Sequence, residues 1–363
     1  MNGTDTPPTY DVVIVGAGFS GIAMLYRLRK LGLSVRIFES GDDFGGVWHW
    51  SQYPGARVDS EWPYYQLNIL EVYKDWTWSE KFPGFAELRR YFAHVDNVLN
   101  LRKDVTFQAH VVDVQWDGSW TTKTRQGHEA RSKYLVLCSG WLHRAFKPDF
   151  PGLQSYKGAL YHTADYPQQI NLQENKVAVI GAGATAVQVV QELAQEVQHL
   201  TVFMQRPSIC LPMRQRPLDD VEQSGWKIYF DALFCEGRRS ATGFPGRQSP
   251  YRAIDVPPDE REEFFLDLWR RGSFNYNMFN YSDIMVNKES NRIVYDFWVK
   301  QTAPRLKNDR KRALMVPKDP PYYFGTKRCP LEQDYYKCWT GIALTLSTSS
   351  THPSKPSMRW ESC

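Results

Sequence analysis

Two glycine-rich turns, each after an apolar run and before a helical pattern, constrain this chain more than any other feature. The first reads Gly16-Ala17-Gly18-Phe19-Ser20-Gly21, and the second reads Gly181-Ala182-Gly183-Ala184-Thr185-Ala186. In a strand–turn–helix unit the first glycine permits a tight turn, the second a close approach to a pyrophosphate, and the third close helix–strand packing. The free N–H groups of the helix then bind the phosphates. The two turns therefore predict an α/β protein with two Rossmann-like, three-layer dinucleotide-binding domains.

The residues after the first turn complete a βαβ unit. An apolar stripe through Ile22, Leu25 and Leu28 predicts a helix over 19–31, and a strand follows at 34–38. This strand ends at Glu39, whose carboxylate would accept hydrogen bonds from both ribose hydroxyls and repel a 2′-phosphate. The first site is therefore predicted to take an adenosine diphosphate without that phosphate, as in FAD or NAD.

The second unit repeats the plan with the opposite charge at its end. Residues 184–196 are predicted to form a helix and 200–204 a strand, after which the chain continues with Gln205 and Arg206. An arginine in this place suits the 2′-phosphate of NADP, because its guanidinium can bind two phosphate oxygens at once. One chain that holds two dinucleotides is most simply interpreted as an electron-transfer enzyme.

Composition excludes several other classes of protein. The net charge of +4 is spread along 363 residues without a long basic run, so nucleic acid is not a predicted partner. No apolar stretch reaches 18 residues, and 1–10 lack the core of a signal peptide, so we expect a cytoplasmic protein without a membrane span. Six cysteines and eight histidines form no CxxC or paired-ligand spacing, which predicts no metal site. The sequence carries no signal for a particular oligomeric state.

The remaining patterns suggest how the chain is divided. We expect a helix near 86–98, a meander of strands at 105–109, 111–116 and 119–124, and a buried strand at 133–138. Helical patterns at 258–271 and 287–306 predict a helical insertion, about 211–315, within the second domain. The predicted division is a first dinucleotide domain over 1–145, a second over 146–337, and an irregular tail over 338–363.

Further motifs occur in a fixed order along the chain. They are Gly45-Gly46-Val47-Trp48, Tyr53-Pro54-Gly55-Ala56-Arg57-Val58-Asp59, Ser139-Gly140 with Pro151-Gly152, the stretch from Tyr156 to Pro167, Gln205-Arg206, Pro317-Lys318, Phe324-Gly325-Thr326-Lys327-Arg328, and Asp334-Tyr335-Tyr336. Together they resemble the Baeyer–Villiger monooxygenases, which belong to the class B flavin monooxygenases. The stretch 156–167 resembles their fingerprint, with Tyr156 in place of Phe and Tyr166 in place of Trp.

The resemblance implies an activity and its cofactors. It implies an FAD- and NADPH-dependent monooxygenase that inserts one oxygen atom of O2 beside the carbonyl of a small apolar ketone, giving an ester or lactone. Secondary metabolism is the setting that it suggests. The alternatives are oxygenation of a nitrogen or sulfur atom, or a truncated, inactive nucleotide-binding relative. The last stays open because family members continue beyond the DYY motif, and their continuation completes the FAD domain. We hypothesise that 338–363 derive from a shifted reading frame or a retained intron.

The resemblance also assigns roles to residues. Arg328 would stabilise the negative charge of oxygen transfer, and Asp59 would be the counter-charge that a buried arginine requires. Lys327 would assist Arg206 at the 2′-phosphate, while Gly158 and His162 belong to the fingerprint in the domain linker. The residues expected to hold the two cofactors are Gly16, Gly18, Phe19, Ser20, Gly21, Glu39, Gly46, Val47, Trp48, Tyr53, Arg57, Asp59, Gly181, Gly183, Ala184, Thr185, Ala186, Gln205, Arg206 and Lys327.

Overall fold

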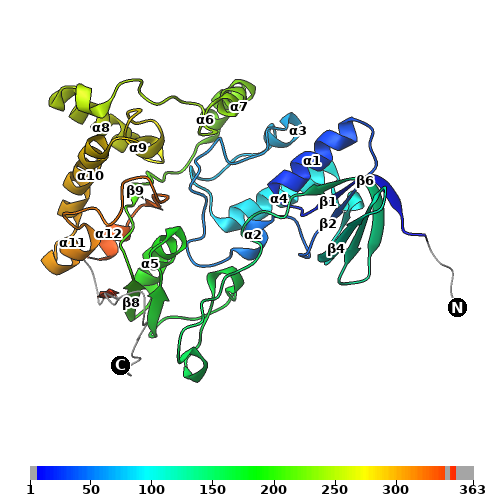
Figure 1. The fold of residues 1–363 in the computed structure, drawn as a ribbon, viewed down its shortest axis with the longest axis horizontal. Coiled ribbons are helices and arrows are strands. Elements are labelled where there is room, and N and C mark those ends of the chain that lie inside the picture. The colour runs from blue at the N-terminus through cyan, green and yellow to red at the C-terminus, as the bar shows by residue number, and fades with distance from the viewer. Residues whose placement is uncertain (1–5, 340–343, 349–363) are drawn as a thin grey trace.

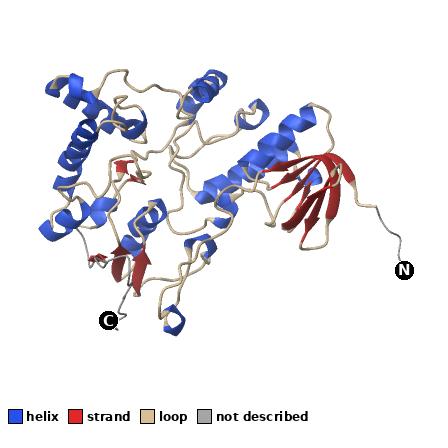
Figure 2. Cartoon of the chain, viewed as in Figure 1, coloured by secondary structure: helices blue, strands red, loops and turns tan. Residues whose placement is uncertain are grey.

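A computed structural model describes residues 6–339 and 344–348 (Figure 1). Its strands gather mainly in one sheet near the N-terminus and a smaller sheet near the C-terminus, and a group of helices lies beside the smaller sheet (Figure 2). This is the two-unit α/β architecture that the paired glycine turns predict. Within the described residues, no helix has both the length and the apolar character needed to cross a bilayer.

The first unit contains a six-stranded sheet in the order β3-β2-β1-β6-β5-β4. Its strands are β1 (Thr9–Val15), β2 (Val35–Phe38), β3 (Val105–Thr106), β4 (Val111–Trp116), β5 (Trp120–Thr124) and β6 (Glu129–Leu137). Strand β1 pairs in parallel with both β2 and β6, while β4, β5 and β6 form an antiparallel meander. The expectation that 105–109 belong to this meander is wrong, because β3 pairs in parallel with β2 at the opposite edge.

The helices of this unit are α1 (Phe19–Lys30), α2 (Val47–Trp50), α3 (Leu70–Tyr73) and α4 (Phe85–Leu99). Alternation along β1 sends Val12 and Ile14 into the main core and Val13 into a small cluster with Phe38 and Ala130 on the other face. Each such fully buried side chain contributes roughly 1.5–3 kcal/mol. The core therefore fixes the plane from which the first glycine turn projects.

One edge of this sheet is only half paired. Strand β6 pairs with β5 over residues 129–132, whereas its pairing with β1 extends to Leu137. Among the described strands, none pairs with the other side of 133–137. Tyr134 and Leu137 on this half are 51% and 67% exposed, and the following loop exposes Trp141 and Phe146.

The second unit is built on a three-stranded parallel sheet in the order β11-β8-β7. Its elements are β7 (Lys176–Ile180), α5 (Ala184–Glu196), β8 (His199–Met204) and β11 (Leu344–Thr348). The expectation of an irregular tail is wrong for 338 and 344–348. Cys338 ends α12 (Tyr335–Cys338), and 344–348, with alternating leucines, pair with the open edge of β8. Residues 340–343 and 349–363 of the predicted tail lie outside the described residues.

The chain between β8 and β11 is largely helical, as the sequence predicts for the insertion. Its elements are β9 (Leu211–Pro212), α6 (Asp220–Lys227), α7 (Phe230–Arg239), α8 (Pro258–Arg271), α9 (Asn275–Met278), α10 (Lys288–Thr302), α11 (Asp309–Met315) and β10 (Leu331–Glu332). The helix predicted over 287–306 stops at Thr302, and a 3-10 turn over 303–305 follows, because Pro304 lacks an N–H donor. The parallel pair of β9 and β10 joins the two ends of the helical segment.

Candidate functional site

The first glycine turn has the geometry that a pyrophosphate cradle requires. Gly16 has φ +104°, and a Cβ there would lie 2.6 Å from the carbonyl oxygen of Cys138. A Cβ at Gly21 would lie 1.9 Å from the carbonyl oxygen of Gly16, so only glycine lets α1 pack against the turn. Helix α1 begins after Gly18 without a side-chain cap, which leaves its first N–H groups available to an anion.

Glu39 stands at the end of β2, where the sequence predicts a ribose-binding acid. Its carboxylate is 5% exposed and accepts hydrogen bonds from the backbone N–H groups of Ala17, at 2.6 Å, and Gly41, at 2.7 Å. These two bonds tie the acid to the glycine turn itself. The Ser40 hydroxyl also donates to the oxygen that Gly41 contacts, at 3.1 Å. The oxygen that Ala17 contacts keeps a second acceptor site, so the group still has capacity for a ribose hydroxyl.

His49 lies beside this acid and was not singled out from the sequence. A Cβ at Gly41 would come within 3.0 Å of the His49 ring, which packs edge-on against Trp50. Burial and the neighbouring Arg89 lower the pKa of His49. Its Nδ1 is buried and has no hydrogen-bond partner in the described part of the chain.

The loop 46–59 runs from the first cradle to the second unit. At its start, a Cβ on Gly46, which has φ +53°, would lie 2.9 Å from Cα of Gly18. Trp48 then donates its indole N–H to the hydroxyl of Tyr65 at 2.8 Å. Further along, Arg57 donates to the Phe82 carbonyl at 3.0 Å and contacts Glu80 at 3.2 Å. The loop is thus anchored at both ends.

Asp59, the last residue of this loop, forms an ion pair with Arg328. The structure therefore brings together the two residues for which the resemblance implies a joint role. The Asp59 side chain is 18% exposed, but that of Arg328 is 60% exposed, so the expectation of a buried arginine is wrong. Arg328 lies 5.5 Å from the ring centre of Phe274, and its outer face is open to solvent. Burial raises the pKa of Asp59, and the nearby guanidinium opposes this shift.

The second glycine turn is open where the first is crowded. Gly181 has φ +138°, and a Cβ there would lie 3.6 Å from Cβ of Ala186, the small residue at the third motif position. A Cβ at Gly183 would meet no atom of the described residues within 4 Å. Helix α5 also begins there without a side-chain cap. The turn therefore presents free N–H groups to an empty space, as a phosphate site requires.

Arg206 and Lys327 lie on segments that Tyr322 connects. The Tyr322 hydroxyl accepts a hydrogen bond from the N–H of Ile209 at 2.9 Å, and Lys327 Nζ lies 5.0 Å from the Tyr322 ring centre. Both Gln205 and Arg206, directly after β8, are exposed. Among the described residues, Arg206 forms no ion pair, so its charge is available to a ligand.

The fingerprint residues serve local structure. His162 Nδ1 accepts a hydrogen bond from the N–H of Ala164 at 3.1 Å and so caps the 3-10 turn 163–165. A Cβ at Gly158 would lie 2.4 Å from the Tyr156 hydroxyl. These contacts do not join His162 to either glycine turn.

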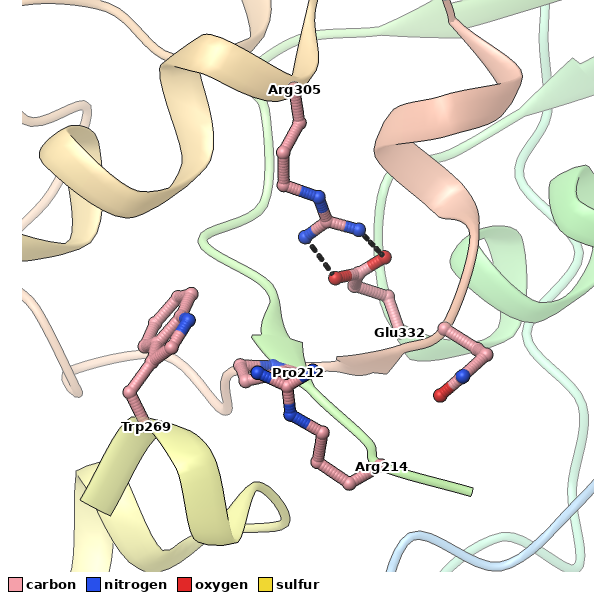
Figure 3. A pocket seen from close by; sticks show the side chains of 6 residues that line it. Pro212, Arg214, Trp269, Arg305 and Glu332 are labelled. Carbon is pink, nitrogen blue, oxygen red and sulfur yellow. Dashed lines mark hydrogen bonds and ion pairs between the residues drawn. The ribbon is translucent and has the colours of Figure 1, made fainter. Parts of the chain in front are cut away.

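A separate cavity of about 190 Å³ opens beside the β9–β10 pair (Figure 3). Its lining residues are Pro212, Arg214, Trp269, Arg305, Glu332 and Gln333. Within it, Arg305 donates two parallel hydrogen bonds, at 2.5 and 3.0 Å, to the carboxylate of Glu332, which is 1% exposed. Sequence reasoning missed this pair. Because it joins β10 to the turn after α10, we assign it to stability.

Replacing Glu332 with alanine is expected to lower the free energy of unfolding by about 2–4 kcal/mol, since removing one partner leaves an uncompensated, partly buried charge. Denaturant titration followed by fluorescence measures the change. Asp267→Ala is the control, because Asp267 pairs with Arg271 at the surface of α8 and should change stability by less than about 1 kcal/mol. Equal losses in the two variants would contradict a special role for the Arg305–Glu332 pair.

Known proteins resemble this chain over both glycine turns and the loop 46–59. Residues 9–214 match the family described as flavin-binding monooxygenase-like. The chain belongs to this family. The match covers the first cradle, the loop 46–59, the second cradle and Arg206, whereas Lys327 and Arg328 lie beyond it.

Individual members of the flavin-binding monooxygenase-like family resemble the chain along most of its length. FAD-binding monooxygenase acrE of Aspergillus aculeatus is 42% identical over 94% of this chain and 58% of its own length. Cyclopentanone 1,2-monooxygenase of a Comamonas species is 34% identical over 93% of this chain and 62% of its own length. The crystal structure of OTEMO in complex with FAD and NADP superposes with a TM-score of 0.88 at 29% identity, covering 94% of this chain and 66% of that one. The chain thus spans about three fifths of its curated relatives.

These comparisons confirm the resemblance to Baeyer–Villiger monooxygenases and the α/β fold with two Rossmann-type units. The roles of individual site residues stay predictions. The structure adds Tyr65 and Gln188 to the candidate site residues of this flavin-binding monooxygenase-like chain. Sequence reasoning missed both. Gln188 did carry a signal, since it is a polar residue flanked by apolar ones in the second helix.

Asp59 also gives the chain a pH dependence that can be measured. Because its pKa is raised in the folded state, the unfolded chain releases the proton first, and stability falls as the pH rises from about 4 through the folded pKa. Asp59→Asn removes this loss of stability, because the asparagine side chain does not titrate. Arg328 then has no ion-pair partner at this position, but it is exposed enough to stay hydrated. We expect a higher melting temperature than the parent chain at pH 7 and no difference below pH 4. A lower melting temperature at pH 7 would contradict this account.

Proposed function

We propose that the chain binds FAD at the first glycine turn and NADPH at the second, and inserts one oxygen atom of O2 next to a ketone carbonyl to give an ester or lactone. The observation that carries the proposal is the Asp59–Arg328 pair at the end of the loop that joins the two cradles. The relatives' names support FAD and the ketone, because they include an FAD-binding monooxygenase and a cyclopentanone monooxygenase. The structure of OTEMO with FAD and NADP supports both cofactors.

The residues at the first turn fit FAD. The uncapped start of α1 suits the pyrophosphate, and Glu39 suits a ribose with two free hydroxyls. Gly18 and Gly46 approach each other so closely that no side chain enters the cradle between them. In this proposal residues 1–145 supply the FAD-binding part that this chain contains.

The residues at the second turn fit NADPH. Gly183, where no described atom would meet an added Cβ, and the uncapped start of α5 suit its pyrophosphate. Arg206, which forms no ion pair with any described residue, suits its 2′-phosphate. Lys327 adds a second positive charge, and its contact with Tyr322, which bonds Ile209, connects it to the segment after β8. Residues 146–337, with the helical segment inserted, form the NADP-binding part of the proposal.

Bound FAD would supply the redox chemistry and the activation of dioxygen, while the protein supplies position and charge. Arg328 provides a guanidinium, a planar cation whose N–H donors have a fixed geometry. Asp59 holds one side of this group, and the exposed side can face a negative charge that develops on a ligand. Tyr65 packs near the pair and is itself fixed by Trp48.

The test is made on the purified chain supplied with FAD. Flavin retention, NADPH oxidation and product mass are measured with cyclic and linear ketones, with a sulfide and an amine as comparison substrates. The proposal expects ester or lactone containing one atom from labelled O2. Oxidation of the sulfide or amine alone would favour heteroatom oxygenation. A colourless chain that does not oxidise NADPH would favour an inactive nucleotide-binding relative.

A further inference from the structure

Gln188 connects the second nucleotide cradle to the loop that carries Asp59. It lies on the first turns of α5, four residues after the helix begins at Ala184, and its side chain is 7% exposed. Its Oε1 accepts a hydrogen bond from the Tyr53 hydroxyl at 2.9 Å, and its Nε2 donates to the Arg57 carbonyl at 3.0 Å. One buried amide thus holds two points of the loop 46–59 from the other unit.

The chemistry of the partners fixes the orientation of this amide. The Arg57 carbonyl can only accept a hydrogen bond, so it must face the NH2 group of Gln188. The amide oxygen then faces Tyr53, whose hydroxyl is able to donate. Glutamate can only accept a hydrogen bond and leucine can neither donate nor accept one, so neither residue replaces both contacts.

The backbone of the loop follows the same surface. Gly55 has φ +75°, and a Cβ there would lie 2.7 Å from the carbonyl oxygen of Gln188 and 2.8 Å from Cγ of Glu192. The loop therefore lies directly on α5 over residues 53–57. Burial raises the pKa of Tyr53, and the neighbouring Thr185, a residue of the second glycine turn, opposes this shift.

We propose that Gln188 is a positioning residue that couples occupancy of the second nucleotide site to the placement of Asp59 and, through it, Arg328. A dinucleotide on the N-terminus of α5 fixes that helix, and Gln188 transmits the constraint to the loop. The inference rests on the proposed function for the identity of the ligands. It makes nucleotide binding at the two cradles interdependent, although 165 residues separate Gly16 from Gly181 along the sequence.

Hydrogen exchange measured with NADP⁺ alone tests the coupling without FAD. In the parent chain, NADP⁺ should slow amide exchange across 53–59. Gln188→Leu should bind NADP⁺ within about twofold of the parent, because Gln188 faces the loop, yet lose this protection. Gln195→Leu is the matched control on the same helix, since Gln195 is exposed and bonds only within α5. Protection that persists in Gln188→Leu would overturn the inference.

A second measurement uses both ligands and a milder variant. FAD should tighten NADP⁺ binding to the parent chain by about 5-fold or more, the lower end of common coupling factors. Gln188→Leu should reduce this factor to near 1, and Tyr53→Phe, which removes only a hydroxyl, should reduce it in part. If FAD tightens NADP⁺ binding by the same factor in both variants as in the parent chain, the inference is wrong and the proposed function is unaffected. A parent chain that binds neither nucleotide overturns the proposed function and the inference with it.

Discussion

Replacing Arg328 with alanine is expected to abolish product formation while leaving reduction of the bound flavin by NADPH within a few-fold of the parent rate. Ester or lactone yield should fall by about 100-fold or more, the usual cost of removing one fixed donor to a developing negative charge. The reason is that Arg328 is the group held against Asp59, with one face free for a ligand. Anaerobic flavin bleaching and product analysis by mass spectrometry separate the two steps.

Two companion variants sharpen this test. Arg328→Lys keeps the charge but loses the planar fork, so it should recover a small part of the yield. Arg292→Ala removes an exposed arginine that pairs with Asp296 on α10, and it should have no effect on either step. Normal product yield from Arg328→Ala would show that Arg328 takes no part in oxygen transfer.

Replacing Arg206 with alanine is expected to raise the KM for NADPH by about 10- to 100-fold, since hydrogen bonds to a charged group contribute about 1.5–3 kcal/mol. The KM for NADH should stay the same, because NADH lacks the 2′-phosphate. Arg206 is suited to this role, being exposed and without an ion pair in the described part of the chain. Steady-state oxidation of the two nucleotides measures the change.

The control for this variant is Arg310→Ala, which removes an exposed arginine from α11. It should leave both KM values unchanged, which excludes a general effect of the net charge. If Arg206→Ala weakened NADPH and NADH equally, the arginine would support the fold of the second cradle and would not select the nucleotide.

Local features of this chain could be predicted from its sequence, because short-range patterns determine them. Helix α8 begins and ends at the predicted residues, and α5 does too. The glycine turns lie where the strands end, and Glu39 contacts the first of them. The comparisons confirm the fold class that follows from these units.

Contacts between distant segments could not be predicted in this way. Tyr53 and Gln188 are 135 residues apart, and no periodicity links them. The pairing of β3 with β2 depends on an open sheet edge, and so does that of β11 with β8. The exposure of Arg328 likewise depends on what packs around it, which its motif does not encode.

The half-paired strand β6 affects how the purified chain will behave. Along 133–137, backbone donors and acceptors on one side meet no described strand, and the bulky apolar side chains of Trp141, Leu142 and Phe146 stand nearby in water. Edges of this kind adhere to one another. We therefore expect the purified chain to self-associate as its concentration rises, so dilute samples or a solubilising fusion partner suit every measurement described above.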